Sequence, residues 1–202
     1  MIIQWFGYSY FRIDSKNKII AINPCFKSST KSRIPRFKSD ILLIPNKQED
    51  YDNKNIVMGN PLILEGAGEI ETGGVFIEGI AQKSNTIYLI KSENMVICHL
   101  GNLEKKSLKE EILEKIANAD ILLVPISEHG TINYEEAISL INQIEPKIIV
   151  PMEYALPGSK IKSDPLDKFI KAISKKPEVL DKLVIRKNNL PTETKLIILN
   201  KQ

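Results

Sequence analysis

Few side chains in this chain could support acid–base, nucleophilic or metal chemistry. Histidine occurs only twice, as His99 and His129, whereas zinc enzymes commonly use several imidazole ligands. Ser9 has no histidine beside it in the sequence to act as its base, so we do not expect a serine nucleophile. His129 lies in a predicted loop before Gly130, and we interpret it as a loop residue rather than a ligand. The sequence therefore argues against an imidazole-rich zinc site.

The elements that must position these residues change character along the chain. The first half is rich in short apolar or alternating runs, which predict strands. These strands are predicted over residues 2–6, 10–14, 18–22, 41–44, 56–58, 62–64, 74–80, 86–91 and 95–99. The glycine pairs at 66–69 and 73–74 have no helix after them to hold a phosphate, so we interpret them as hairpin turns.

The second half alternates helices with buried strands. Helices are predicted over 107–117, 133–144 and 164–175, with Ser107, Asn133 and Asp164 as N-caps. Strands are predicted over 121–125, 147–150, 184–185 and 195–199. A strand-rich first half followed by a second half in which helices alternate with strands favours two packed sheets with helices outside.

Length and composition predict one globular domain over residues 1–202. Of the 202 residues, 43% are hydrophobic and 26% are charged, as is usual for a soluble domain. No apolar run approaches the roughly 20 residues of a membrane helix, and no signal peptide is visible, so we expect a cytoplasmic protein without membrane contact. Two cysteines, Cys25 and Cys98, are too few for a disulfide framework and are predicted to be small buried side chains.

Six segments, in order along the whole chain, resemble the small metal-dependent hydrolases of the metallo-β-lactamase superfamily. They are Trp-Phe-Gly-Tyr-Ser-Tyr-Phe at 5–11, Ile-Ala-Ile-Asn-Pro at 20–24, Asp-Ile-Leu-Leu-Ile at 40–44, Ile-Cys-His-Leu-Gly-Asn-Leu at 97–103, Gly-Thr-Ile-Asn at 130–133 and Val-Pro-Met-Glu-Tyr at 150–154. The resemblance implies an α/β fold, an αββα sandwich in which two face-to-face sheets carry helices on both outer sides.

The resemblance also assigns positions to the family's metal ligands, and most of them are substituted here. The family's His-x-His-x-Asp-His loop falls on residues 46–51, where this chain has Asn46, Gln48, Asp50 and Tyr51. The later histidine is retained as His99. The bridging aspartate becomes Asn102, and the final histidine becomes Glu153. Only Asp50 and His99 match among these seven positions.

The substitutions remove charge and donor strength from a two-metal site. A neutral amide is a poor zinc ligand, and Asn102 lacks the negative charge with which an aspartate would join two cations. Tyr51 would have to ionise, far below its ordinary pKa of about 10. The amides of Asn23, Asn46, Gln48 and Asn102 could instead hydrogen-bond to one another. We therefore predict a protein without a metal cofactor, a pseudoenzyme or binding protein whose partner is a small molecule or another protein.

Two alternatives remain at this point. Asp50, His99 and Glu153, brought to one cleft by the fold that the resemblance implies, could hold one Mn²⁺, Mg²⁺ or Zn²⁺ ion. Its bound water could hydrolyse an ester or phosphoester, with Asp50 as the candidate catalytic residue. The basic segment at 27–38 could contact nucleic acid, but it has little aromatic interleaving for base stacking, and a solvated loop is the favoured interpretation.

Overall fold

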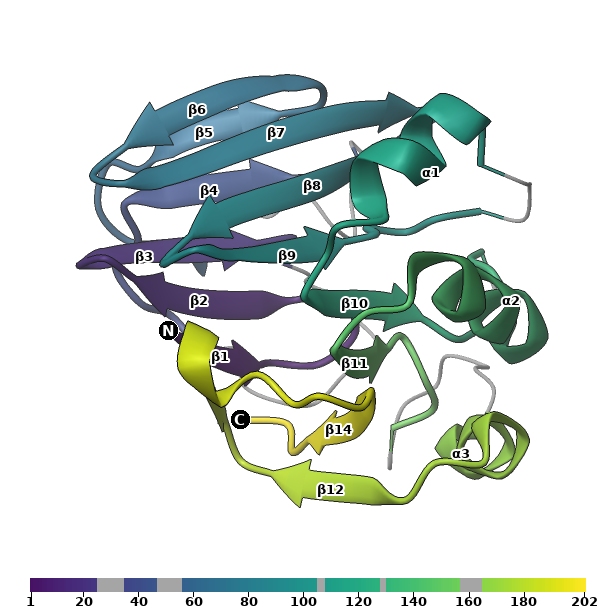
Figure 1. Cartoon of the computed structure of the whole chain (residues 1–202). Coiled ribbons are helices and arrows are strands. Elements are labelled where there is room, and N and C mark those ends of the chain that lie inside the picture. The colour runs from purple at the N-terminus through teal and green to yellow at the C-terminus, as the bar shows by residue number, and fades with distance from the viewer. Residues whose placement is uncertain (25–34, 47–55, 105–107, 128–129, 157–164) are drawn as a thin grey trace.

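Two β-sheets pack face to face in the computed structural model, which describes residues 1–24, 35–46, 56–104, 108–127, 130–156 and 165–202 (Figure 1). The six-stranded sheet has the order β13-β1-β2-β3-β4-β5. Its strands are β1 (Ile2–Trp5), β2 (Phe11–Ser15), β3 (Lys18–Ile22), β4 (Ile41–Ile44), β5 (Leu62–Glu65) and β13 (Leu183–Val184). The eight-stranded sheet has the order β12-β14-β11-β10-β9-β8-β7-β6. Its strands are β6 (Gly68–Thr72), β7 (Val75–Gln82), β8 (Asn85–Ser92), β9 (Met95–His99), β10 (Ile121–Pro125), β11 (Ile148–Met152), β12 (Pro177–Leu180) and β14 (Lys195–Leu199).

The sequence pattern accounts for the way these strands lie. In β2, burial alternates along the strand, so that one side enters the core between the sheets. In β4, β10 and β11 every residue is buried, because these continuous apolar runs are covered on both faces. Strands β9, β10, β11 and β14 run parallel, as the alternation of helices and strands predicts. Cys98 lies buried in β9 as predicted, whereas Cys25 falls outside the described residues.

The helices within the described residues are α1 (Glu110–Ile116), α2 (Tyr134–Ile144) and α3 (Leu166–Ile173). Asn133 caps α2 as predicted, since its side chain accepts a hydrogen bond from the Glu136 backbone N–H at 2.8 Å. Two predicted starts are wrong by a few residues: α1 follows Lys109, which gives no side-chain cap, and α3 follows Pro165. The predicted caps Ser107 and Asp164 lie outside the described residues. None of the described helices is long and apolar enough to cross a membrane.

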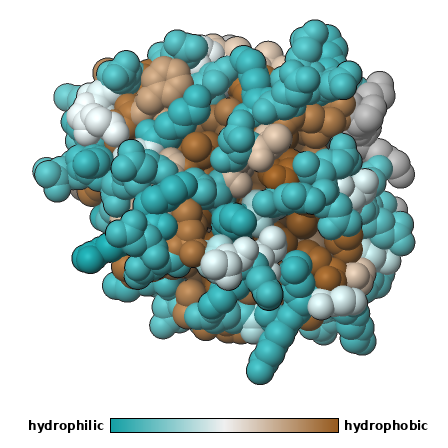
Figure 2. Space-filling model, viewed as in Figure 1, coloured by the Kyte–Doolittle hydropathy of each residue, from teal (hydrophilic) through white to brown (hydrophobic). Residues whose placement is uncertain are grey.

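The sandwich is confirmed, but its two outer faces differ. The ribbon drawing places α1 and α2 beside the eight-stranded sheet (Figure 1), and α2 contacts β10. No described helix lies on the six-stranded sheet, where helices were also expected. That outer face is covered instead by a small apolar cluster that contains Tyr10, Leu42, Ile44 and Ile56. Figure 2 shows a mostly polar surface interrupted by apolar patches on the face viewed in Figure 1.

Tyr88 joins the two sheets beside the chain that leaves β4. Its ring is fully buried in β8, and its hydroxyl lies 2.8 Å from the carbonyl oxygen of Ile44 and 2.9 Å from that of Leu64. The backbone N–H of Gly66 donates to the same hydroxyl at 3.2 Å. Burial raises the pKa of Tyr88, so the hydroxyl remains a donor. One side chain of the eight-stranded sheet thus fixes the ends of β4 and β5 in the other sheet.

We expect Tyr88→Phe to lower the free energy of unfolding by about 1–3 kcal/mol, because it leaves buried backbone groups without their partner. The measurement is urea denaturation followed by tryptophan fluorescence. The matched control is Tyr134→Phe, since the Tyr134 hydroxyl only approaches Glu135 on the exposed side of α2. Equal losses in the two variants would contradict a special role for Tyr88.

Candidate functional site

Polar side chains from four chain segments meet at one end of the sandwich. We call Ser9, Asn23, Asn102 and Glu153 the polar cluster. Ser9 lies between β1 and β2, Asn23 follows β3, Asn102 follows β9 and Glu153 follows β11. All four are buried, with Asn102 the most exposed at 7%. Because two of these segments belong to each sheet, the cluster connects both layers of the fold.

Each hydrogen bond inside the polar cluster has a defined donor and acceptor. The Ser9 hydroxyl donates to Glu153 Oε1 at 2.7 Å. Asn23 Nδ2 donates to Ser9 Oγ at 2.6 Å and to Asn102 Oδ1 at 2.8 Å. Among the fully buried side-chain atoms of the four, Asn23 Oδ1 is described with no hydrogen-bond partner. The predicted pairing of amides is therefore observed between Asn23 and Asn102, with Ser9 between Asn23 and the carboxylate.

Unusual backbone conformations place these side chains. Tyr8, Asn23 and Glu153 have positive φ angles of 51°, 53° and 62°, a region that residues other than glycine seldom adopt. The Glu153 N–H donates to the Tyr8 carbonyl at 3.3 Å, and the Asn23 N–H donates to the Leu43 carbonyl at 2.9 Å. Non-glycine residues with positive φ tend to cluster at functional sites, so these turns are consistent with a specialised site at this end of the sheets.

The loop after β9 is fixed by Asn85, which the sequence analysis did not identify. Asn85 Oδ1 accepts from the Asn102 N–H at 2.8 Å, and Asn85 Nδ2 donates to the Leu100 carbonyl at 2.8 Å. Gly101 has a φ of 61°, and a Cβ there would collide with Asn85 Oδ1 and approach the Thr86 carbonyl to 2.9 Å. A polar residue at the start of a predicted strand gives no signal of this role in a single sequence.

His99 is fully buried beside the polar cluster, with both ring nitrogens bonded to backbone groups. The Gly101 N–H donates to Nδ1 at 3.0 Å, so the neutral ring carries its proton on Nε2, which lies 3.1 Å from the Ser9 carbonyl. Burial lowers the pKa of His99 to about 4, partly opposed by the bond to Ser9. In this arrangement both ring nitrogens are engaged by the backbone, and the role of His99 as a metal ligand stays a prediction.

The remaining predicted site residues are only partly described. Asn46 is buried and lines a cavity of about 520 Å³ together with Asn85 and Lys83. Gln48, Asp50, Tyr51 and His129 lie outside the described residues. Of the three residues proposed to hold a single ion, Glu153 and His99 thus lie in the same region, and the position of Asp50 stays a prediction.

The described residues do not fit a two-metal centre. They contain no group of three or more histidine, cysteine, aspartate or glutamate side chains that could hold a metal ion. At Asn102, where the resemblance places the bridging aspartate, an amide hydrogen of Asn23 occupies Oδ1. Two cations would need anionic bridging and nitrogen donors, and Glu153 is the only carboxylate of the polar cluster.

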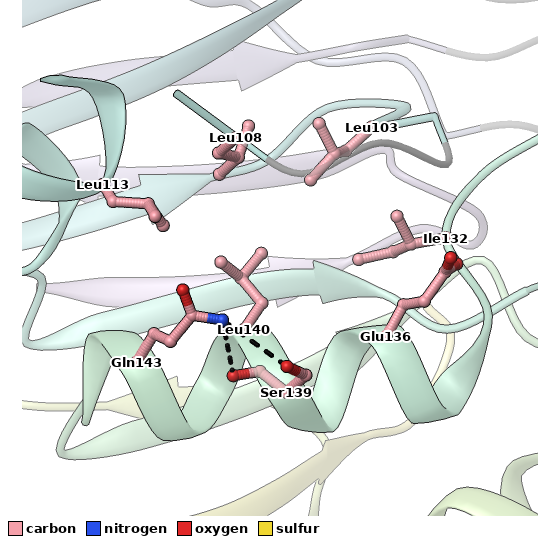
Figure 3. Close-up of a pocket in the computed structure, with 8 residues that line it drawn as sticks. All are labelled: Leu103, Leu108, Leu113, Ile132, Glu136, Ser139, Leu140 and Gln143. Atoms are coloured by element: carbon pink, nitrogen blue, oxygen red, sulfur yellow. Dashed lines mark hydrogen bonds between the residues drawn. The ribbon is translucent and has the colours of Figure 1, made fainter. Parts of the chain in front are cut away.

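An apolar cavity of about 200 Å³ is lined in part by Leu103, the residue that follows Asn102 in the sequence (Figure 3). Its apolar wall consists of Leu103, Leu108, Leu113, Ile132 and Leu140. The Ile132 N–H donates to the Leu103 carbonyl at 2.8 Å, which fixes two sides of the cavity to each other. Figure 3 shows Leu140 of α2 rising toward Leu108, with Ser139 and Gln143 hydrogen-bonded on the helix beside it. An apolar cavity of about 150 Å³ in another protein binds benzene. This cavity can therefore take an apolar group of at least that size.

We expect Ser9→Ala and Asn23→Ala each to lower the free energy of unfolding by about 1–3 kcal/mol, because each leaves buried polar partners unsatisfied. Their effects should be non-additive in the double variant, since the two side chains share one network. The control is Ser39→Ala, because the buried Ser39 hydroxyl has no hydrogen-bond partner and its removal should cost little. Additive losses in a denaturant titration would argue against the network.

Protonation of His99 should lower stability in acid. The unfolded imidazole binds its proton near pH 6.5, whereas the folded one does so only near pH 4. The unfolded state therefore holds more protons between these values, and stability falls as the pH falls from about 6.5 to 4, by at most about 3 kcal/mol. Urea denaturation of His99→Gln, which keeps an N–H for the Ser9 carbonyl, should show a shallower loss in this window. Identical pH profiles for the two proteins would refute this role.

Comparison with known proteins agrees with the fold. The beta-lactamase superfamily domain model matches residues 2–153. A UPF0173 protein of Pyrococcus furiosus is 26% identical over 87% of this chain and 92% of its own length. A UPF0173 metal-dependent hydrolase of Pyrococcus horikoshii is 29% identical over 88% and 94%. A solved structure of a candidate Zn-dependent hydrolase of the metallo-β-lactamase superfamily from Thermotoga maritima has a TM-score of 0.83 and 27% identity, with 98% of each chain covered. This chain therefore belongs to the β-lactamase superfamily.

Proposed function

We propose that this protein is a member of the superfamily that has lost the two-metal hydrolase chemistry and keeps the fold as a binding protein. The observation that carries the proposal is the direction of the hydrogen bonds in the polar cluster. Asn23 directs one amide hydrogen at Asn102 Oδ1, an atom at the family's bridging position that would have to turn toward a cation if one were bound, and the other at Ser9 Oγ. The oxygens of Ser9 and Asn102 are thus satisfied by hydrogen bonds from a neutral amide, without attraction to a metal ion.

The other reactive groups at this end of the molecule favour the same proposal. Ser9 is fully buried and gives its single hydroxyl hydrogen to Glu153, and no imidazole of the described residues is bonded to this hydroxyl as a base would be. His99 has both nitrogens bonded to the backbone and a pKa lowered by burial to about 4, so it is neutral and occupied at physiological pH. Neither side chain is arranged as a nucleophile or a general base.

The charges of the polar cluster indicate what kind of small molecule could bind beside it. Glu153 presents a carboxylate, and the oxygens of Asn102 and Asn23 are further acceptors, the latter without a partner. A ligand that complements them carries N–H or O–H donors, whereas a phosphate or carboxylate would meet the charge of Glu153. The apolar cavity walled by Leu103 and Ile132 would receive an apolar group.

Metal analysis tests the proposal directly. We expect far less than one equivalent of zinc, manganese or iron in protein purified without chelator, and no rise in melting temperature on adding Zn²⁺ or Mn²⁺. A working site saturated at a hundred times its Kd would add about 2.7 kcal/mol to the free energy of unfolding, which a thermal melt detects easily.

Asp50→Ala separates specific from adventitious metal. Near-stoichiometric metal in the natural chain that Asp50→Ala abolishes would overturn the proposal and favour the single-ion hydrolase that the sequence left open. If the metal content is the same in Asp50→Ala and dialysis removes the metal, the metal is bound at the surface and the proposal stands. Esterase and phosphodiesterase assays on the same samples should show no activity dependent on Asp50.

A further inference from the structure

The edge of the six-stranded sheet at β5 carries an exposed apolar surface. Within the described part of the chain β5 has β4 on one side and no strand on the other. Leu62 is 53% exposed and Ile63 48%, and the nearby Met58 is 45% exposed. Three of the five large hydrophobic side chains described as exposed therefore gather at this edge. In Figure 1, β5 lies at one end of the sandwich, beside the terminal strand β6 of the other sheet.

The other terminal strands carry the features that usually prevent edge pairing. Strand β13 is only two residues long, and β12 begins at Pro177 and contains Glu178. Strand β6 alternates Glu69 and Glu71 with its less exposed residues. By contrast β5 reads Leu-Ile-Leu-Glu, with no charge before its last position. Pro61 precedes it and withholds one backbone donor from the open edge. An exposed apolar edge of four residues with no charge at its centre is a surface for pairing with another strand.

The backbone of β5 shows which residue could pair. The Leu62 N–H donates to the Asp40 carbonyl at 2.8 Å, and the Gly66 N–H donates to the Ile44 carbonyl at 3.2 Å. Even-numbered residues therefore direct their backbone groups toward β4. Because alternate residues of a strand face opposite edges, the N–H and C=O of Ile63 point to the open side.

We propose that β5 pairs antiparallel with β5 of a second copy of this chain, across a twofold axis at Ile63. In this register Ile63 lies opposite Ile63 of the second copy and exchanges two hydrogen bonds with it. Leu62 lies opposite Leu64 of the second copy on the other face. A twofold contact must be self-complementary, and this register places only aliphatic side chains at its centre.

Charge also favours a second copy as the occupant. The two Glu65 side chains fall at opposite ends of the pair, about 13 Å apart at roughly 3.3 Å per residue, which exceeds the screening length of about 10 Å at 0.1 M salt. Each lies opposite Pro61 of the other copy, so no like charges meet. Because four residues make a contact smaller than the usual ~800 Å² per partner, the dimer is expected to be weak, with a micromolar Kd.

Sedimentation over micromolar to several hundred micromolar protein tests the pairing. The natural chain should shift from monomer to dimer with concentration, and Ile63→Lys should raise the Kd at least about tenfold, or about 1.4 kcal/mol. The matched control is Val184→Lys, because Val184 is 60% exposed on the short edge strand β13 and should leave the Kd unchanged. A monomer at all concentrations, or a dimer insensitive to Ile63→Lys, would overturn the proposal.

A cross-link identifies the register even if the lysine variant folds poorly. Residues opposite each other in a hydrogen-bonded antiparallel pair have Cα atoms about 5.5 Å apart, within the range that a disulfide spans. In a Cys25→Ser background, Ile63→Cys should form a disulfide-linked dimer under mild oxidation, whereas Val184→Cys should not. Equal cross-linking of both variants would contradict the twofold pair. The result does not depend on whether the protein binds metal.

Discussion

The hydroxyl of Ser9 imposes the constraint from which the site follows. A buried hydroxyl has one hydrogen to give, and here the hydrogen goes to the carboxylate of Glu153 at 2.7 Å. Asn23 must then approach the same oxygen with its amide nitrogen rather than its carbonyl oxygen, and the second amide hydrogen is left for Asn102. Since an unsatisfied buried polar group is costly, this order of donors and acceptors fixes the ends of β3, β9 and β11 relative to one another. The polar cluster thus connects the two sheets at this end of the sandwich, as the Tyr88 hydroxyl does beside β4.

The same constraint explains why His99 lies where it does. The Ser9 carbonyl receives the Nε2 proton of His99, and the Gly101 N–H meets Nδ1. The ring is therefore held neutral between two backbone segments, and its burial disfavours the charged form. A neutral imidazole beside the single carboxylate of Glu153 leaves the cluster with few charged groups. This arrangement suits a packed, hydrogen-bonded interior better than the concentration of charge that divalent cations require.

The sequence predicted the frame of the fold better than the geometry of its site. Apolar runs such as β4, β10 and β11 could be recognised because burial on both faces leaves a continuous hydrophobic signature. The bond between Asn23 and Asn102 could also be anticipated, because two amides at neighbouring strand ends complement each other. Ser9 was judged only as a nucleophile, since nothing in one sequence reveals that positive φ at Tyr8 turns its hydroxyl inward. Strands β6 and β12 were not predicted, because charged residues interrupt their apolar pattern at the sheet edges.

Fold and chemistry therefore depend on different residues of this chain. The strands are specified by interior aliphatic side chains, and they superpose on a Thermotoga maritima structure with a TM-score of 0.83 despite 27% identity. The site depends on the first residues beyond the strand ends, at Asn23, Asn102 and Glu153, which contribute little to the apolar core. Exchanges there can alter charge and donor type without disturbing the sheets, provided that the new polar groups satisfy one another. Membership of a hydrolase superfamily consequently assigns the fold without by itself assigning the reaction, and the polar groups at the strand ends are the better guide to function.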